Sequence, residues 1–175
     1  MKQDRNFAPA LCAVLCAQAI ALNFLEGLIP EIPFLPPGAK PGFSNIVTMF
    51  AAGSLGLPYA LTIAFVKSLF TFATRGFTAF VMSFSGGMLS CLAGYFLLKY
   101  ASKRLGYTGI SVVCALCHNL GQLIASVFIT GSGMTFYYAP FLIIFGVITG
   151  LITGVIFSAV LPALLKQAKH FKADK

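Results

Sequence analysis

The chain has 175 residues, of which 58% are hydrophobic and 9% are charged, and its mean hydropathy is +0.90. Values of this kind exclude an ordinary soluble domain and predict an integral membrane protein. The net charge of +8 is explained by membrane topology and by attraction to anionic lipid. We therefore expect the lipid bilayer, and no nucleic acid, among the partners.

The apolar runs predict an all-α bundle of six transmembrane helices in a single domain over residues 1–175. About 20 apolar residues cross the hydrocarbon core of a bilayer. Spans are expected at about 8–29, 43–56, 57–75, 79–99, 109–130 and 137–161. No P-loop, metal-ligand cluster or nucleophile triad is visible in the sequence. We therefore expect no catalytic residue, no metal and no cofactor.

The first predicted span carries three small side chains at intervals of four residues, Ala13, Ala17 and Ala21. This spacing aligns them on one face of a helix, where the backbone of another helix can approach closely. The second helix could belong to another protein, which would make this face a docking surface. It could equally belong to this chain, which would make the alanines part of its own packing.

A loop that is dense in proline follows the first span, over residues 31–42. Proline forbids a helix there and stiffens the chain. The loop includes Lys40 and is preceded by Glu26, and we expect it to act as a lid over a bound ligand. Asn45 then begins a short span that glycine and proline interrupt, and such interrupted spans often flank binding sites in transporters.

Lys67 lies near the centre of the third span. A lysine at that depth costs about 2.5 to 3.5 kcal/mol, so its side chain should face a partner, water or a ligand. Snorkelling toward the membrane surface is the alternative. Glu26 carries the opposite charge, so the two residues indicate a zwitterionic or polar ligand, unless they pair with each other.

The fifth span contains a polar patch, His118, Asn119 and Gln122, in an otherwise apolar segment. In a helix the three side chains lie close together near mid-membrane depth. With Lys67 they would line the floor of a ligand cavity. Alternatively they join helices, because interhelical hydrogen bonds are common in membranes and contribute about 0.6 kcal/mol each.

The same span matches the C-x-x-C-H pattern of haem attachment at Cys114, Cys117 and His118. Covalent haem attachment needs an accessible loop outside the cytoplasm, whereas this match lies in the middle of a span. We interpret all five cysteines as small apolar side chains.

Gly146, Gly150 and Gly154 repeat every four residues in the sixth span. Such a row makes a flat ridge on one face of a helix. We expect this ridge to pack tightly against another helix.

The positions of Lys and Arg predict the orientation of the chain. With the N-terminus inside, most of them fall in cytoplasmic segments, and the outer loops hold only Lys40 and Arg75. We therefore expect both termini in the cytoplasm. The polar groups then converge on a cavity that faces outward.

Two motifs are fairly specific, His-Asn-x-Gly-Gln at 118–122 and Pro-Gly-x-Lys at 37–40. Together with Leu25-Glu26, Ser85-Gly86-Gly87 and the glycine-rich last helix, they resemble a small membrane family. That family is labelled heptaprenyl diphosphate synthase component I or Gx transporter, and it is similar to the substrate-binding S components of energy-coupling-factor (ECF) transporters. The resemblance covers roughly residues 11–160.

The resemblance implies a six-helix S component that captures a small vitamin- or precursor-like molecule on the outer side of the plasma membrane of a bacterium. The alanine face of the first helix would dock on a transmembrane coupling protein, which ATPase subunits drive. A membrane accessory protein of isoprenoid or quinone metabolism, or of flavin-linked electron transfer, is the alternative. The candidate substrate-binding residues are Glu26, Lys40, Asn45, Lys67, His118, Asn119 and Gln122.

Overall fold

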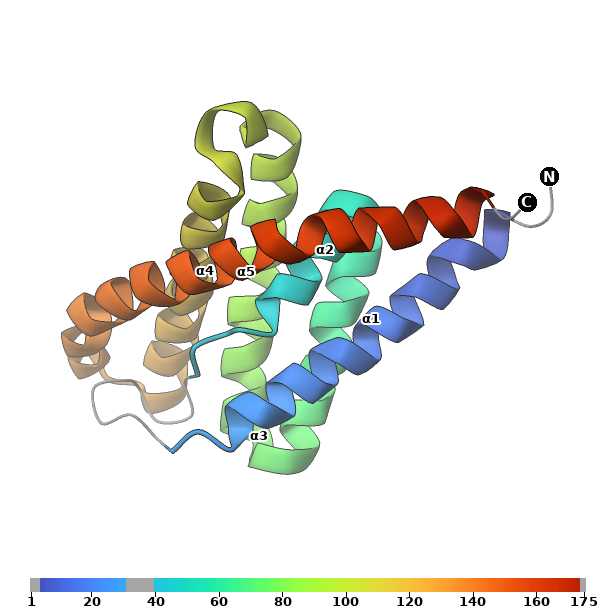
Figure 1. The fold of residues 1–175 in the computed structure, drawn as a ribbon. Helices are drawn as coiled ribbons and strands as arrows, with labels where there is room; N and C mark the ends of the chain where they lie inside the picture. Colours follow the sequence, from blue (N-terminus) through green and yellow to red (C-terminus); the bar gives the residue numbers. More distant parts are fainter. Residues whose placement is uncertain (1–3, 31–39, 174–175) are drawn as a thin grey trace.

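The computed structural model describes residues 4–30 and 40–173, with side chains placed for 7–30 and 40–162. Figure 1 shows that this part of the chain is built from helices. The elements are α1 (Asp4–Gly27), α2 (Asn45–Ser54), α3 (Leu57–Tyr100), α4 (Ser102–Thr130), the 3₁₀ helix η1 (Gly133–Tyr138) and α5 (Ala139–Ala173).

α3 is a helical hairpin, because the chain reverses at Gly76. This glycine has φ 84° and ψ −177°, a conformation that side-chain-bearing residues rarely adopt. The two halves run side by side, as the edge-to-face contact of Phe72 with Phe80 and the 3.3 Å contact between the hydroxyls of Ser68 and Ser83 indicate. In Figure 1 the halves descend to a turn and rise again. They correspond to the third and fourth predicted spans.

α2 is shorter than the predicted span over 43–56. It has ten residues, which make a helix of about 15 Å, whereas the hydrocarbon core is about 30 Å thick. As a straight helix α2 is therefore too short to cross the bilayer, in line with the interruption by glycine and proline expected for this span. Within the described residues four segments are long and apolar enough to span a membrane, and the second of them contains both halves of the α3 hairpin: Phe7–Gly27, Leu57–Tyr100, Ser102–Thr130 and Gly133–Pro162.

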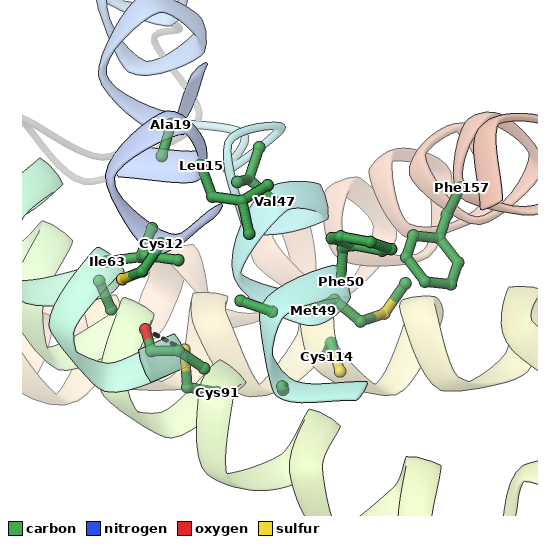
Figure 2. Packing of buried hydrophobic residues seen from close by; sticks show 14 of the residues in the cluster. Cys12, Leu15, Ala19, Val47, Met49, Phe50, Ile63, Cys91, Cys114 and Phe157 are labelled. Atoms are coloured by element: carbon green, nitrogen blue, oxygen red, sulfur yellow. Dashed lines mark hydrogen bonds between the residues drawn. The ribbon is translucent and has the colours of Figure 1, made fainter. Parts of the chain in front are cut away.

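The main hydrophobic core surrounds α2 (Figure 2). Val47 and Phe50 of α2 are buried among Leu15 of α1, Ile63 of α3 and Phe157 of α5. The core also takes in the thiols of three cysteines, which behave as small apolar groups: Cys12, Cys91 and Cys114. A short helix that is enclosed on nearly every side is held by this packing and not by its own length.

The glycine ridge of the last helix packs against α4, as the spacing predicts. A Cβ atom at Gly150 would lie 2.5 Å from Cα of Val112, and one at Gly154 would lie 2.7 Å from Cα of Thr108. At these two positions the backbones of α4 and α5 are so close that only the hydrogen atom of a glycine fits between them. The hydroxyls of Ser111 and Thr153 meet across the same interface at 2.7 Å.

The outer surface of the bundle is apolar. Large side chains such as Phe77, Phe128 and Val155 are 66%, 83% and 63% exposed, and they would face water in a soluble protein. A surface of this composition suits lipid, because monomeric soluble proteins rarely expose large contiguous apolar patches. The chain is an integral membrane protein.

Candidate functional site

Buried polar side chains gather where the C-terminal end of α1, the start of α2, the α3 hairpin and the middle of α4 converge. They enclose a cavity of about 10 Å³, which is room for about one water molecule. We call it the polar cavity. Its polar lining consists of Asn23, Glu26, Lys40, Ser44, Lys67, Arg75, Ser83, His118 and Gln122.

Lys67 is the most deeply buried charged side chain of this lining, with an exposed fraction of 1%. Its Nζ donates to Oδ1 of Asn45 at 2.6 Å and to Oγ of Ser44 at 3.1 Å. The side chain therefore points inward to the start of α2 and does not snorkel to the membrane surface.

Glu26 is also buried, with 4% of its surface exposed. Its Oε1 accepts a hydrogen bond of 2.6 Å from the backbone N–H of Ser44. Among the described residues no direct ion pair joins Glu26 to Lys67. Each of them makes a hydrogen bond to Ser44, Glu26 to its backbone N–H and Lys67 to its hydroxyl. The two charges are thus neighbours across one serine, and both remain close to the cavity.

Two side chains of this network, Asn23 and Ser44, are absent from the residues predicted from sequence. Asn23 Nδ2 donates to the carbonyl of Lys67 at 3.1 Å and to Oγ1 of Thr71 at 2.6 Å, which fastens α1 to α3. Asn23 precedes Glu26 by three residues, so both lie on the same helix face. Asn23 could therefore have been predicted from its spacing to Glu26 in an otherwise apolar span. Nothing in the sequence except its position beside Asn45 indicates Ser44.

Gln122 and His118 make a pair on α4. Nε2 of Gln122 donates to the carbonyl of Lys40 at 3.1 Å and contacts Nε2 of His118 at 2.7 Å. The carbonyl contact assigns the amide orientation, so the ring Nε2 of His118 is the acceptor and its proton lies on Nδ1. Two buried atoms of this pair have no hydrogen-bond partner in the described part of the chain, Nδ1 of His118 and Oε1 of Gln122.

Two glycines hold the His118 ring between them. A Cβ atom at Gly42 would lie 2.8 Å from the ring and one at Gly86 would lie 2.7 Å from Nδ1. Gly42 also has φ +83°, so it is required both for its backbone conformation and for space. Gly86 belongs to the Ser-Gly-Gly element of α3, and its role is to let α3 and α4 close around the histidine.

Asn119 lies apart from the polar cavity. Its Nδ2 donates to the carbonyl of Leu142 on α5 at 2.7 Å. The sequence patch at 118–122 is therefore divided between two interfaces, since His118 and Gln122 face α3 and the chain around Lys40. In this structure Asn119 makes a contact between helices.

The remaining predicted residues have the following positions. Lys40 lines the polar cavity and its Nζ donates to the carbonyl of Ile29. Asn45 reaches the network through Lys67 and lines a small cavity next to it. Most of the predicted lid over 31–42, namely 31–39, lies outside the described residues.

Ala13, Ala17 and Ala21 are exposed on α1. Leu15 and Ala19, on the opposite face of the helix, are buried in the core at 3% and 0% exposure. Within the described residues the three alanines therefore lie outside the hydrophobic core.

A second and larger cavity of about 750 Å³ runs between α1, α2 and α5. Its walls are mostly apolar, with side chains such as Leu25, Ile46 and Ile156, and its lining includes two polar residues, Gln18 and Glu26. A polar ligand would leave most of its hydrogen-bonding groups without partners there. The polar cavity is smaller, but its chemistry suits a polar ligand, so it is the candidate binding site. Among the described residues no three His, Cys, Asp or Glu side chains come together as metal ligands would.

The fold and the buried polar cavity together define an all-helical membrane protein with the fold of an ECF-transporter S component. The solved structure described as "Structure and mechanism of the S component of a bacterial ECF transporter" matches with a TM-score of 0.66 and 20% sequence identity, over 92% of this chain and 99% of that one. At this identity the likeness shows the fold and not the activity.

The chain belongs to the family described as heptaprenyl diphosphate synthase component I, which it matches over residues 15–160. No curated protein matches the chain.

Proposed function

We propose that this protein is the substrate-binding subunit of an ECF-type uptake transporter in the plasma membrane of a bacterium. The observation that carries the proposal is the polar cavity itself. Buried charged and amide groups from α1, α3 and α4, together with the N-cap serine of α2, surround it in a fold that is similar to a transporter S component. Polar groups inside a membrane are costly and mark binding sites or transport paths.

The proposed topology has six transmembrane segments with both termini in the cytoplasm. The two halves of α3 count as separate segments, and the short α2 would complete the set by lying within the bundle. The turn at Gly76 and the turn after α4 lie at one end of the bundle, and the turn between α3 and α4 lies at the other (Figure 1). Lys99, Lys103 and Arg104 cluster at the second end, which supports a cytoplasmic position for it.

The proposed partners are a transmembrane coupling protein and ATPase subunits. The exposed face of Ala13, Ala17 and Ala21 would receive a helix of the coupling protein. Small side chains let two helix backbones approach closely, and van der Waals packing and backbone contacts hold such pairs together.

The family name favours a second candidate, a membrane accessory protein of prenyl diphosphate synthesis. The whole sequence has only four Asp and Glu residues. A diphosphate-bound Mg²⁺ is usually held through carboxylates, and the acids here are too few and too scattered to form paired acidic motifs. A role beside a separate synthase is compatible with this composition, and a role as the catalytic chain is not.

Co-purification tests the proposal. The tagged protein, expressed from its own genome context, should bring down an ATPase pair and a coupling protein. Recovery of a prenyl diphosphate synthase in their place would overturn the transport function in favour of the second candidate.

A further inference from the structure

Resting on the proposed function, we propose that the large apolar cavity between α1, α2 and α5 receives one transmembrane helix of the coupling protein. We call this cavity the apolar groove. Gln18 of α1 is the polar contact that fixes the register of the incoming helix. The partner helix is therefore apolar along its buried face and carries one amide or hydroxyl side chain that reaches Gln18.

Gln18 is a polar side chain on the surface of a membrane-spanning helix. It is exposed and lies near the middle of the apolar segment Phe7–Gly27, about 14 Å from the nearer end at 1.5 Å per residue. A glutamine side chain is too short to reach the headgroups from that depth. Within the described part of the chain its amide makes no hydrogen bond. Hydrocarbon offers no partner either, so the amide is left unsatisfied.

Other polar side chains of the membrane segments are satisfied within the chain. Asn23 and Glu26, on the same helix, turn inward and bond to α3 and to the N-cap of α2. The exposed Thr62 and Thr74 bond back to backbone carbonyls one turn earlier on their own helix. Gln18 uses neither solution. A group from outside the chain is therefore needed to satisfy its amide.

The wall around Gln18 has the pattern of a helix-packing face. The residues of α1 that line the apolar groove follow one another at alternating intervals of three and four: Leu15, Gln18, Leu22, Leu25 and Ile29. This spacing is typical of a seam between two helices, and here it extends over about 21 Å of α1. A single polar residue in such a seam specifies the register of the two helices.

The space opposite this seam is large enough for another helix to enter. In the described part of the chain the Cα atoms of α1 and α5 nowhere come within 8 Å of each other, whereas α2 contacts both. The groove therefore has α1 and α5 as its sides and α2 as its floor. Its volume is about 750 Å³.

Hydrogen bonding and position select the occupant. A lipid chain could fill the apolar volume, but it has no donor or acceptor at the depth of Gln18, whereas polar side chains of membrane helices bond across helix interfaces. Ala21 lines the groove and also belongs to the alanine face that is proposed to receive the coupling protein. The groove thus continues that face, and one partner helix would contact both.

Photo-crosslinking in cells tests the occupant. The full-length chain is expressed in its own genome context with p-benzoylphenylalanine in place of Leu25 or Ile156, which are exposed on opposite sides of the groove. The same photoreactive residue in place of Phe128, which is exposed on α4 outside the lining, is the control. We expect both groove positions to crosslink to one transmembrane segment of the coupling protein, identified by mass spectrometry, and the control position not to do so.

Variants of Gln18 test the hydrogen bond. Gln18→Leu should lower recovery of the coupling protein by about three- to eighteen-fold, the range that corresponds to one interhelical hydrogen bond. Val14→Leu, at an exposed position of α1 outside the lining, should assemble as the wild type does. Adding Val14→Gln to Gln18→Leu moves the amide by one turn and should not restore assembly. The melting temperature of purified Gln18→Leu in nanodiscs should not fall, since the amide makes no bond within the described chain.

The outcomes separate this inference from the proposed function. Normal recovery of the coupling protein by Gln18→Leu, or a clearly lower melting temperature of this variant, overturns the role of Gln18. Groove crosslinks to a second copy of the chain or to lipid alone overturn the docked helix, even if the wild type co-purifies with a coupling protein and ATPases. If the wild type recovers no coupling protein, the transport function fails. The groove then remains a helix site only if both of its positions crosslink to one helix of another identified membrane protein and Gln18→Leu weakens that crosslink.

Discussion

Gln122 and Asn119 are neighbours in the sequence, but their side chains serve different interfaces. Gln122 contacts His118 and the carbonyl of Lys40 beside the polar cavity. Asn119 binds the carbonyl of Leu142 on α5. The same substitution at the two positions should therefore have opposite effects on affinity and stability.

Asn119→Leu should lower the free energy of unfolding by about 0.6 to 1.7 kcal/mol, the range measured for interhelical hydrogen bonds, and leave substrate affinity unchanged. Gln122→Leu should weaken binding by about 1 to 2 kcal/mol and change the melting temperature little. Thermal unfolding and ligand titration of both purified variants measure the two effects. A loss of affinity in Asn119→Leu would contradict its assignment to helix packing.

Gly86 and Gly87 form a matched pair for testing how α3 closes on His118. A methyl group at Gly86 would lie 2.7 Å from both Nδ1 and the carbonyl oxygen of His118, whereas at Gly87 the nearest atom is 3.6 Å away. Gly86→Ala should therefore cost about 1 to 3 kcal/mol of stability through overpacking and weaken ligand binding. Gly87→Ala should be tolerated, since alanine also favours a helix. Thermal unfolding in detergent compares the two, and equal melting temperatures would contradict the close contact.

At the scale of elements, α1 connects the polar cavity to an exposed face. Asn23 and Glu26 bind α3 and the N-cap of α2, while Ala17 faces away from the bundle. If the alanine face receives a coupling protein, the same helix carries the ligand contacts and the partner contacts. A change on one face can then be tested without touching the other.

Ala17→Trp should abolish assembly with the coupling protein, because a large side chain prevents close approach of two helices. Ligand affinity should stay unchanged, since Ala17 is not part of the cavity lining. Ala159→Trp, at an exposed position of α5, is the control for a bulky residue on the lipid-facing surface. Co-purification measures assembly, and normal assembly of Ala17→Trp would place the docking face elsewhere.

At the scale of the whole molecule, the orientation in the membrane decides whether the polar cavity serves uptake. Lys103 and Met134 are exposed, and in the sequence they directly follow the turn between α3 and α4 and the turn after α4. Figure 1 shows these two turns at opposite ends of the bundle. In a background whose five cysteines are replaced by alanine, Met134→Cys should react with a membrane-impermeant thiol reagent on intact cells. Lys103→Cys should react only after the membrane is opened. The reverse pattern would invert the proposed topology.

Much of this architecture could be predicted from sequence, for reasons that are local. The bilayer requires long apolar segments, so the spans that correspond to α1, both halves of α3, α4 and α5 follow from hydropathy. The ridge of Gly146, Gly150 and Gly154 follows from periodicity, because three residues at intervals of four share a helix face. The length of α2 did not follow, since its apolar flanks continue the hydrophobic run beyond the ends of the helix.

The sequence by itself determined that this is a membrane-embedded helical bundle and that Glu26, Lys67, His118 and Gln122 need partners inside it. Only the tertiary structure decided which partners they have. Ser44 stands between the two charges, and Asn119 turns to α5. Such choices depend on how neighbouring helices are rotated and spaced, which is set by packing over the whole bundle. Hydropathy and spacing along one chain contain no information about that rotation.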